Sequence, residues 1–127
     1  MTKPTYTQDY KAIEHLLLNQ YSEGGKQAKS DIMKPAFNEV ATMYSIAENG
    51  DLTGGSVNDT LFPTIDNHFK PSNNPTVAIA YIDIVGTAAS ARVDTDELSG
   101  YGFTDYFNLL KINGKWQIVS KIFHAHY

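Results

Sequence analysis

The sequence predicts an α+β protein in which helices pack on one face of a strongly bent antiparallel sheet. In the first half of the chain, apolar residues recur at helical spacing. From Val77 onward they alternate with polar residues, as they do in strands. Finally, Asn113-Gly114 separates two apolar-rich runs, which is a strong signal for a two-residue hairpin turn.

Helices are expected where the apolar spacing is three or four residues, which is the case over residues 7–23 and 26–33 and from Ser56 or Asn58 to His68. Gly24-Gly25 is expected to end the first helix, because glycine adopts the left-handed cap conformation without strain. Pro35 is expected to interrupt the second helix or to start a new turn, since proline lacks the backbone N–H that a helix interior needs.

Strands are expected where the period is two or where short apolar runs lie between turn residues, namely over 41–47, 52–55, 77–85, 88–93, 101–112 and 115–126. The turn at Asn113-Gly114 sets the register of the last two. If Ile112 pairs with Lys115, one face of this hairpin carries Tyr106, Asn108, Leu110, Val119, Lys121 and Phe123. The other face carries Asp105, Phe107, Leu109, Trp116, Ile118, Ser120, Ile122 and His124. Both faces are largely apolar, so we expect helices to cover one and a second subunit to cover the other.

Composition narrows the functional classes. The 127 residues are typical of a single domain spanning 1–127, and the 42% hydrophobic content is that of a globular protein. There is no cysteine, which excludes disulfides and thiolate catalysis. The net charge of −4 argues against nucleic-acid binding. Neither a signal peptide nor an apolar run of membrane-spanning length is expected, which predicts a cytoplasmic protein without membrane contact.

A family resemblance is carried by Leu17–Gly24, by Ile84–Val93, and above all by Asp105–Lys111 with Gly114–Lys121. In these segments the chain resembles the nuclear-transport-factor-2-like superfamily, and most closely its putative lumazine-binding branch beside the SnoaL-like (polyketide-cyclase-like) group. The resemblance covers nearly the whole chain. It implies a cone-shaped, cystatin-like fold whose curved antiparallel sheet wraps N-terminal helices and leaves a cavity at its open end. Members commonly pair through the convex sheet face, and they include enzymes as well as binding and assembly modules, so the fold alone does not set the function.

Ketosteroid isomerases of this superfamily hold an oxyanion with a tyrosine on the first helix and an acid on a late strand, and use a carboxylate base on the first strand. Aligning the chain by its helix-ending glycine and last hairpin places these roles at Leu17, Tyr106 and Ser45. Leu17 cannot donate a hydrogen bond and Ser45 is no base. The resemblance therefore does not imply steroid-type isomerisation.

A mostly apolar ligand pocket is predicted inside the cone, lined by Leu17, Tyr21, Ala91, Val93, Tyr106, Asn108, Val119, Lys121 and Phe123. Lys121 is the sharpest catalytic candidate, because a lysine among apolar residues can act as a base or form a Schiff base. Tyr106 is its candidate acid/base partner. The alternative for Lys121 is a structural side chain that reaches the rim or pairs with an acid.

The opposite face is expected to form a dimer interface through Phe107, Leu109, Trp116, Ile118 and Ile122. Arg92 is expected to pair with Asp105 there. His124 and His126 lie two apart on one strand face, but no third ligand is evident, so no metal and no cofactor is expected.

Three functional hypotheses follow from the sequence. The leading one is a homodimeric protein that binds an unidentified small molecule. The second is an isomerase, cyclase or dehydratase of SnoaL-like type that uses Lys121 and Tyr106. The third is an assembly module that binds no ligand.

Overall fold

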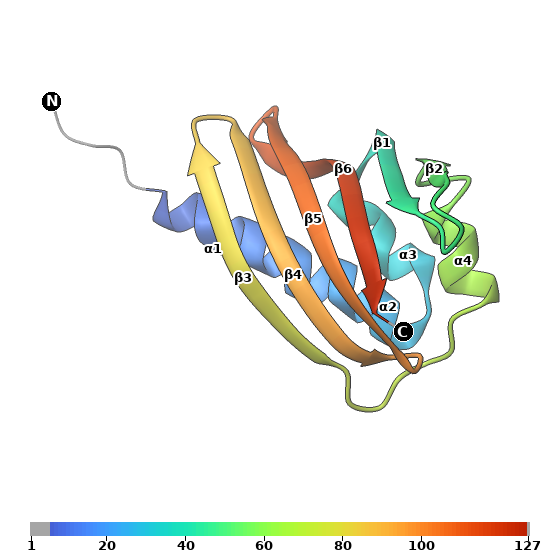
Figure 1. Cartoon of the computed structure of the whole chain (residues 1–127). Coiled ribbons are helices and arrows are strands. Elements are labelled where there is room, and N and C mark those ends of the chain that lie inside the picture. Colours follow the sequence, from blue (N-terminus) through green and yellow to red (C-terminus); the bar gives the residue numbers. More distant parts are fainter. Residues whose placement is uncertain (1–5, 127) are drawn as a thin grey trace, which may run out of the picture.

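The structure is a computed structural model that describes residues 6–126. It is an α+β fold in which the helices cover the concave face of one curved sheet (Figure 1), as predicted. The sheet has six strands: β1 Phe37–Ile46, β2 Leu52–Ser56, β3 Thr76–Val85, β4 Ala88–Leu98, β5 Tyr101–Ile112 and β6 Lys115–His126. Their order is β2-β1-β6-β5-β4-β3. The pairing of β1 with β6 is parallel and all others are antiparallel.

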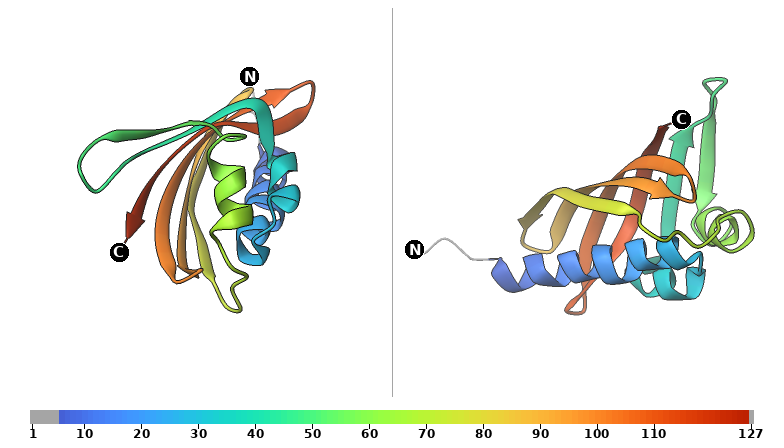
Figure 2. Two further views of the ribbon diagram at one scale, coloured as in Figure 1. Left: turned by 90° about the vertical axis from the view of Figure 1, so that its right-hand side faces the viewer. Right: turned by 90° about the horizontal axis from the view of Figure 1, so that it is seen from below.

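The N-terminal helical run continues past the predicted end at Gly24-Gly25. It consists of α1 Thr7–His15, a π-helical segment Leu16–Ser22, and α2 Glu23–Gln27. Ala28 ends it in the left-handed conformation, with φ of 56°. The glycines serve packing: a Cβ on Gly24 would lie 2.7 Å from the Cβ of Met33. Figure 2 shows this run crossing the concave side of the sheet.

Shorter helical elements close the wider end of the sheet. α3 Ser30–Met33 is followed by a 3-10 turn, Lys34–Ala36, which contains the predicted interruption at Pro35. α4 Leu61–Asn67 lies beside them and is shorter than the predicted third helix. Asp66 of α4 accepts hydrogen bonds from the Ser30 amide (2.9 Å) and the Ser30 hydroxyl (2.7 Å), which joins α4 to the start of α3.

The last hairpin contains a β-bulge that the sequence did not reveal. Leu109 pairs with Ile118, as predicted, but Asn108 pairs with Ser120, so Val119 is an extra residue in β6. One extra residue reverses the faces of everything after it. Lys121 therefore shares the concave face with its partner Phe107, and the predicted grouping of Lys121 with Tyr106 is wrong.

The structure also corrects the predicted dimer interface. Phe107, Leu109, Trp116 and Ile118 are buried under the helices of the same chain, each at most 4% exposed. They form the hydrophobic core and leave no surface for a second subunit. Of the predicted set, Ile122 lies outside, at 56% exposed, and it pairs with the exposed Tyr106 on the convex face.

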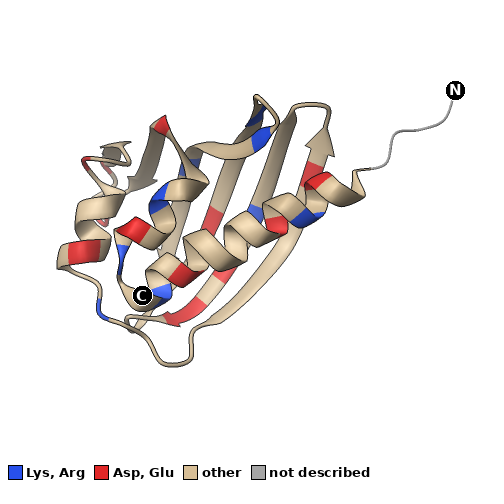
Figure 3. Cartoon of the chain, turned by 180° about the vertical axis from the view of Figure 1, so that it is seen from behind, with Lys and Arg blue, Asp and Glu red and all other residues tan. Residues whose placement is uncertain are grey.

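Charges of both signs are spread over helices and strands without a continuous band of either (Figure 3). Among residues 6–126, no helix combines the length and apolar character needed to cross a membrane.

Asp9 links α1 to the last hairpin through two hydrogen bonds. Its Oδ1 accepts hydrogen bonds from Lys111 Nζ and Trp116 Nε1, each at 2.9 Å. These two donors hold the pKa of Asp9 below its ordinary value of 3.8. A carboxyl whose pKa is lowered by folding stabilises the fold fully above the unfolded value and loses that contribution as the pH falls through the folded value.

We therefore expect Asp9→Asn to lower the melting temperature at neutral pH, and the difference from wild type to vanish as the pH falls below 3.8. Thermal unfolding followed by circular dichroism across this pH range measures it. The control is Asp31→Asn, because the Asp31 side chain is 93% exposed in its 3.5 Å pair with Lys34. A difference in melting temperature between Asp9→Asn and the wild type that persists unchanged below pH 3.8 would contradict this role of the Asp9 carboxylate.

Candidate functional site

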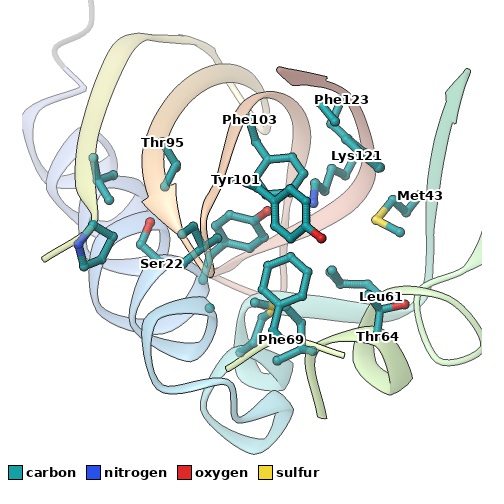
Figure 4. Close-up of a pocket in the computed structure, with 18 of the residues that line it drawn as sticks. Ser22, Met43, Leu61, Thr64, Phe69, Thr95, Tyr101, Phe103, Lys121 and Phe123 are labelled. Atoms are coloured by element: carbon teal, nitrogen blue, oxygen red, sulfur yellow. The ribbon is translucent and has the colours of Figure 1, made fainter. Parts of the chain in front are cut away.

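A cavity of about 410 Å³ opens between the helices and the concave face, near the β4–β5 turn (Figure 4). Its lining is mostly apolar. Four aromatic side chains form one wall: Phe69 stacks on Tyr101 and Phe103, with centroids 6.1 and 6.0 Å away, and Phe103 meets Phe123 edge-on at 5.9 Å. An apolar enclosure of this size with few polar groups is typical of a small-molecule site.

Lys121 brings an amine to this cavity. β6 presents its side chain among Phe103, Phe123 and Met43 (Figure 4). The side chain is 6% exposed. Its Nζ lies 4.8 Å from the ring centroid of Phe123 and 5.0 Å from that of Tyr21. Cation–π contacts of this kind favour the charged amine, whereas burial favours the neutral one.

Asp105 and Tyr21 complete a buried cluster with Lys121. Asp105 Oδ1 lies 3.4 Å from Lys121 Nζ, at ion-pair distance, but receives no directed hydrogen bond. Asp105 Oδ2 accepts a hydrogen bond of 3.0 Å from the Tyr21 hydroxyl. Tyr21 and Lys121 line the cavity, and Asp105 lies behind them. We call these three residues the Lys121 cluster.

Burial controls the protonation of the Lys121 cluster. It raises the pKa of Asp105 above 3.8 and lowers the pKa of Lys121 below 10.5, because both charged forms lose solvation. Their mutual attraction opposes both shifts. Burial, with the neighbouring Asp105 charge, raises the pKa of Tyr21 well above 10.0, so the phenol stays protonated. The two shifts bring the pKa of the amine and the pKa of the carboxyl closer together.

The π-helical segment positions Tyr21 and Ser22, which both line the cavity although they are adjacent in sequence. Short π-helical turns inside α-helices are frequent at functional sites. The Ser22 hydroxyl is buried and has no hydrogen-bond partner within the described chain. An unpaired buried hydroxyl costs stability, so it is a candidate contact for a ligand.

Ser22→Ala is expected to raise the free energy of unfolding by about 1 kcal/mol, because the variant removes an unsatisfied polar group. Urea unfolding of the ligand-free protein measures this. Ser30→Ala is the matched control: its hydroxyl donates to Asp66 at 2.7 Å, so its loss should destabilise the protein by about 1 kcal/mol. Equal destabilisation by both variants would show that the Ser22 hydroxyl has a structural partner.

Only some of the predicted pocket residues line the cavity in the structure. Tyr21, Lys121 and Phe123 line the cavity. Leu17, Ala91 and Val93 are fully buried in the core and do not line it. Val119 is the half-buried bulge residue.

Two predicted pocket residues lie on the convex face. Tyr106 is 41% exposed, and Asn108 is exposed with its amide donating to Ser120 Oγ at 3.0 Å. They point away from the cavity, so Tyr106 as acid/base partner of Lys121 is wrong. The position one residue earlier, Asp105, supplies the partner instead.

Sequence reasoning placed Asp105 on the convex face beside Arg92. In the structure Arg92 pairs with Asp94 at 3.2 Å and Asp105 is 2% exposed. A tyrosine from the first helix and an acid from a late strand do meet, but at Tyr21 and Asp105 rather than Leu17 and Tyr106. The available signal was that Asp105 shares its strand face with the apolar Phe107 and Leu109.

The two C-terminal histidines lie together, with ring centroids 5.0 Å apart. His126 Nε2 is 3.0 Å from the Thr104 hydroxyl. Within residues 6–126, no group of three histidine, aspartate or glutamate side chains is placed to hold a metal ion.

Comparisons with known proteins agree with this architecture. The sequence profile of the family described as Putative lumazine-binding matches residues 8–124. A solved NTF2-like protein of unknown function from Shewanella baltica OS155 is 55% identical, with a TM-score of 0.94 over 98% of this chain and 99% of that one.

Two further proteins are similar. Aldolase FrzH from Cladobotryum sp is 33% identical over 110 residues, which are 84% of this chain and 83% of that protein. A Putative Scytalone Dehydratase from Novosphingobium aromaticivorans superposes with a TM-score of 0.71 at 18% identity, over 95% of this chain and 86% of that one. At that identity the likeness concerns the fold alone.

Proposed function

Because the chain belongs to the Putative lumazine-binding family, which has the NTF2-like fold, we propose that it binds a small, largely apolar carbonyl compound in the cavity and moves protons on it through Lys121. The observation that carries this proposal is the Lys121 cluster on the wall of an apolar cavity of about 410 Å³. A buried amine with an adjacent carboxyl and phenol is suited to proton transfer.

The relative named Aldolase FrzH supports the choice of a carbonyl substrate. Aldol chemistry makes or breaks a bond at the carbon next to a carbonyl, and it needs a group that removes a proton there. The apolar, aromatic wall formed by Phe69, Tyr101, Phe103 and Phe123 favours a ligand with an aromatic or otherwise apolar body.

Deuterium exchange tests this proposal without knowledge of the natural substrate. Acetonaphthone, a methyl ketone with an aromatic body, is incubated with the protein in deuterium oxide, and NMR follows loss of its methyl proton signal. We expect exchange well above that caused by free lysine at equal concentration. Binding of acetonaphthone without added exchange would reject the enzyme and leave a binding module; neither binding nor exchange would reject the pocket as a carbonyl site.

We also propose that the chain forms a homodimer through the convex face of the sheet. The strand register aligns Tyr44, Ile122, Tyr106, Arg92 and Tyr81 in one row across five strands. The apolar members are between 38% and 56% exposed, which is unusual for such a contiguous group on a monomer.

Light scattering at micromolar concentration tests the dimer. We expect a mass of two chains for the wild type and of one chain for Ile122→Glu, because a carboxylate between Tyr44 and Tyr106 would lose its solvation in the interface. Val85→Glu is the control, since Val85 is 74% exposed and lies outside the row. A wild-type monomer would refute this part of the proposal.

A further inference from the structure

We infer that Lys121 reacts covalently with an aldehyde or ketone in the cavity and forms an imine, with Asp105 as the proton carrier behind it. This inference rests on the proposed function and specifies its chemistry. It chooses between the two roles that a lysine among apolar residues can have, base or nucleophile.

The first argument is which polar atoms face the ligand. Among the lysines that the structure describes, Lys121 alone lines this cavity. The Tyr21 hydroxyl is engaged with Asp105 at 3.0 Å, and Asp105 does not line the cavity. A cluster that stabilised an enolate only by hydrogen bonds would direct its phenol and acid protons at the ligand. Here the phenol donates its proton to the Asp105 carboxylate, and the amine is the group of this cluster that is presented to the ligand.

The second argument is the surroundings of the amine. The rings of Tyr21 and Phe123 flank Nζ at 5.0 and 4.8 Å, and the side chain is 6% exposed. Burial also lowers the pKa of Lys121, which makes the neutral, nucleophilic amine accessible below pH 10.5. A dry apolar wall protects an imine from hydrolysis, because water is kept from the C=N carbon.

The third argument is that the cluster supplies the necessary proton transfers. The ammonium first gives a proton to Asp105, whose Oδ1 lies 3.4 Å away and lacks a directed hydrogen bond. The neutral nitrogen attacks the carbonyl carbon, a C–N bond forms, the C=O π bond breaks, and one N–H proton moves to the carbonyl oxygen, which becomes a hydroxyl. That hydroxyl leaves as water with the proton returned by Asp105, and a C=N bond remains. Amine plus carbonyl gives imine plus water, so no oxidant or reductant is needed.

The product fits the same electrostatics. A protonated imine carries the positive charge that the ammonium carried, so it can keep the ion pair with Asp105. The Tyr21 hydroxyl continues to hold the other carboxylate oxygen. In this arrangement Tyr21 is a positioning residue, because it acts on the ligand through Asp105.

Reductive trapping tests the inference on the wild-type protein. The protein is incubated with naphthaldehyde and sodium cyanoborohydride, which reduces an imine to a stable secondary amine, and the adduct is located by peptide mass spectrometry. We expect Lys121 to be modified first, at one adduct per chain, ahead of exposed lysines such as Lys11 and Lys115. Lys121→Met should lose this adduct, and Lys115→Met should retain it.

The outcomes separate this inference from the proposed function. Adducts spread over exposed lysines, with Lys121 unmodified while acetonaphthone still exchanges its protons, would overturn the imine and leave Lys121 as a base. No adduct at Lys121 and no exchange would overturn both. The mapping needs no variant, so a poorly folding Lys121→Met protein would not obscure the result.

Discussion

Asp105→Ala is expected to lower the free energy of unfolding by about 3–5 kcal/mol, the largest effect on stability that we predict. The variant leaves Lys121 buried without its counter-ion and leaves the Tyr21 hydroxyl without its acceptor. Breaking one half of a buried pair is costly because the remaining charge cannot recover its hydration.

The double variant Asp105→Ala/Lys121→Met is the control for Asp105→Ala. Methionine matches the length of the lysine stem and carries no charge, so the double variant should recover a large part of the lost stability. Urea unfolding of the wild type, both single variants and the double variant gives the coupling energy. A double variant as unstable as the sum of its single variants would show that Asp105 and Lys121 do not interact.

Lys121→Met is expected to reduce deuterium exchange into acetonaphthone by about 10²–10⁴-fold, the range associated with loss of an acid–base group. The fold should survive, because burial has already raised the pKa of Asp105 and the carboxyl can remain protonated when the amine is gone. Lys115→Met, at the exposed first residue of β6, should leave exchange unchanged. A folded Lys121→Met protein with full exchange would remove Lys121 from the chemistry.

The pH dependence of exchange distinguishes a chemical role of Asp105 from a structural one. Exchange should rise with pH as the Lys121 amine loses its proton, with a midpoint below the ordinary lysine pKa of 10.5 because burial lowers it. The Asp105 carboxylate opposes that shift by attraction. Asp105→Asn removes the charge, so its midpoint should move to still lower pH. A midpoint that does not move would indicate that Asp105 only fills space.

The sequence predicted the fold because its signals are local. Alternation from Val77 onward and the Asn113-Gly114 turn specify strands, and the helical stripe that contains Ile13 and Leu17 specifies the covering helix. The predicted helix end at Gly24-Gly25 failed because the need for space next to Met33 is a tertiary property. Spacing alone cannot distinguish a glycine that caps from one that packs.

Only part of the candidate site could be predicted from the sequence. Lys121 and Tyr21 were identified from pattern and resemblance, but the bulge at Val119 places Lys121 on the face of Asp105 and Phe107 rather than on that of Tyr106. Both hairpin faces are apolar, so no change of polarity marks the extra residue. Asp105 was missed for a different reason: the face that it shares with Phe107 and Leu109 was assigned to the convex side, whereas all three residues are buried.

The π-helical segment is a further feature that periodicity could not predict. The spacing of Leu17 and Tyr21 is also that of an ordinary α-helix, so it does not reveal the π-helical segment. In the structure, Leu17 enters the core while Tyr21 and Ser22 reach the cavity. The π-helical segment is wider than an α-helix, and this difference decides which of its residues line the cavity.

A crystal structure of the wild-type protein after reaction with naphthaldehyde and cyanoborohydride tests the central claim most directly. We predict electron density that continues from Lys121 Nζ into the cavity and lies against Phe103 and Phe123. A cavity closed by its own side chains, with Lys121 still paired only with Asp105, would contradict the account.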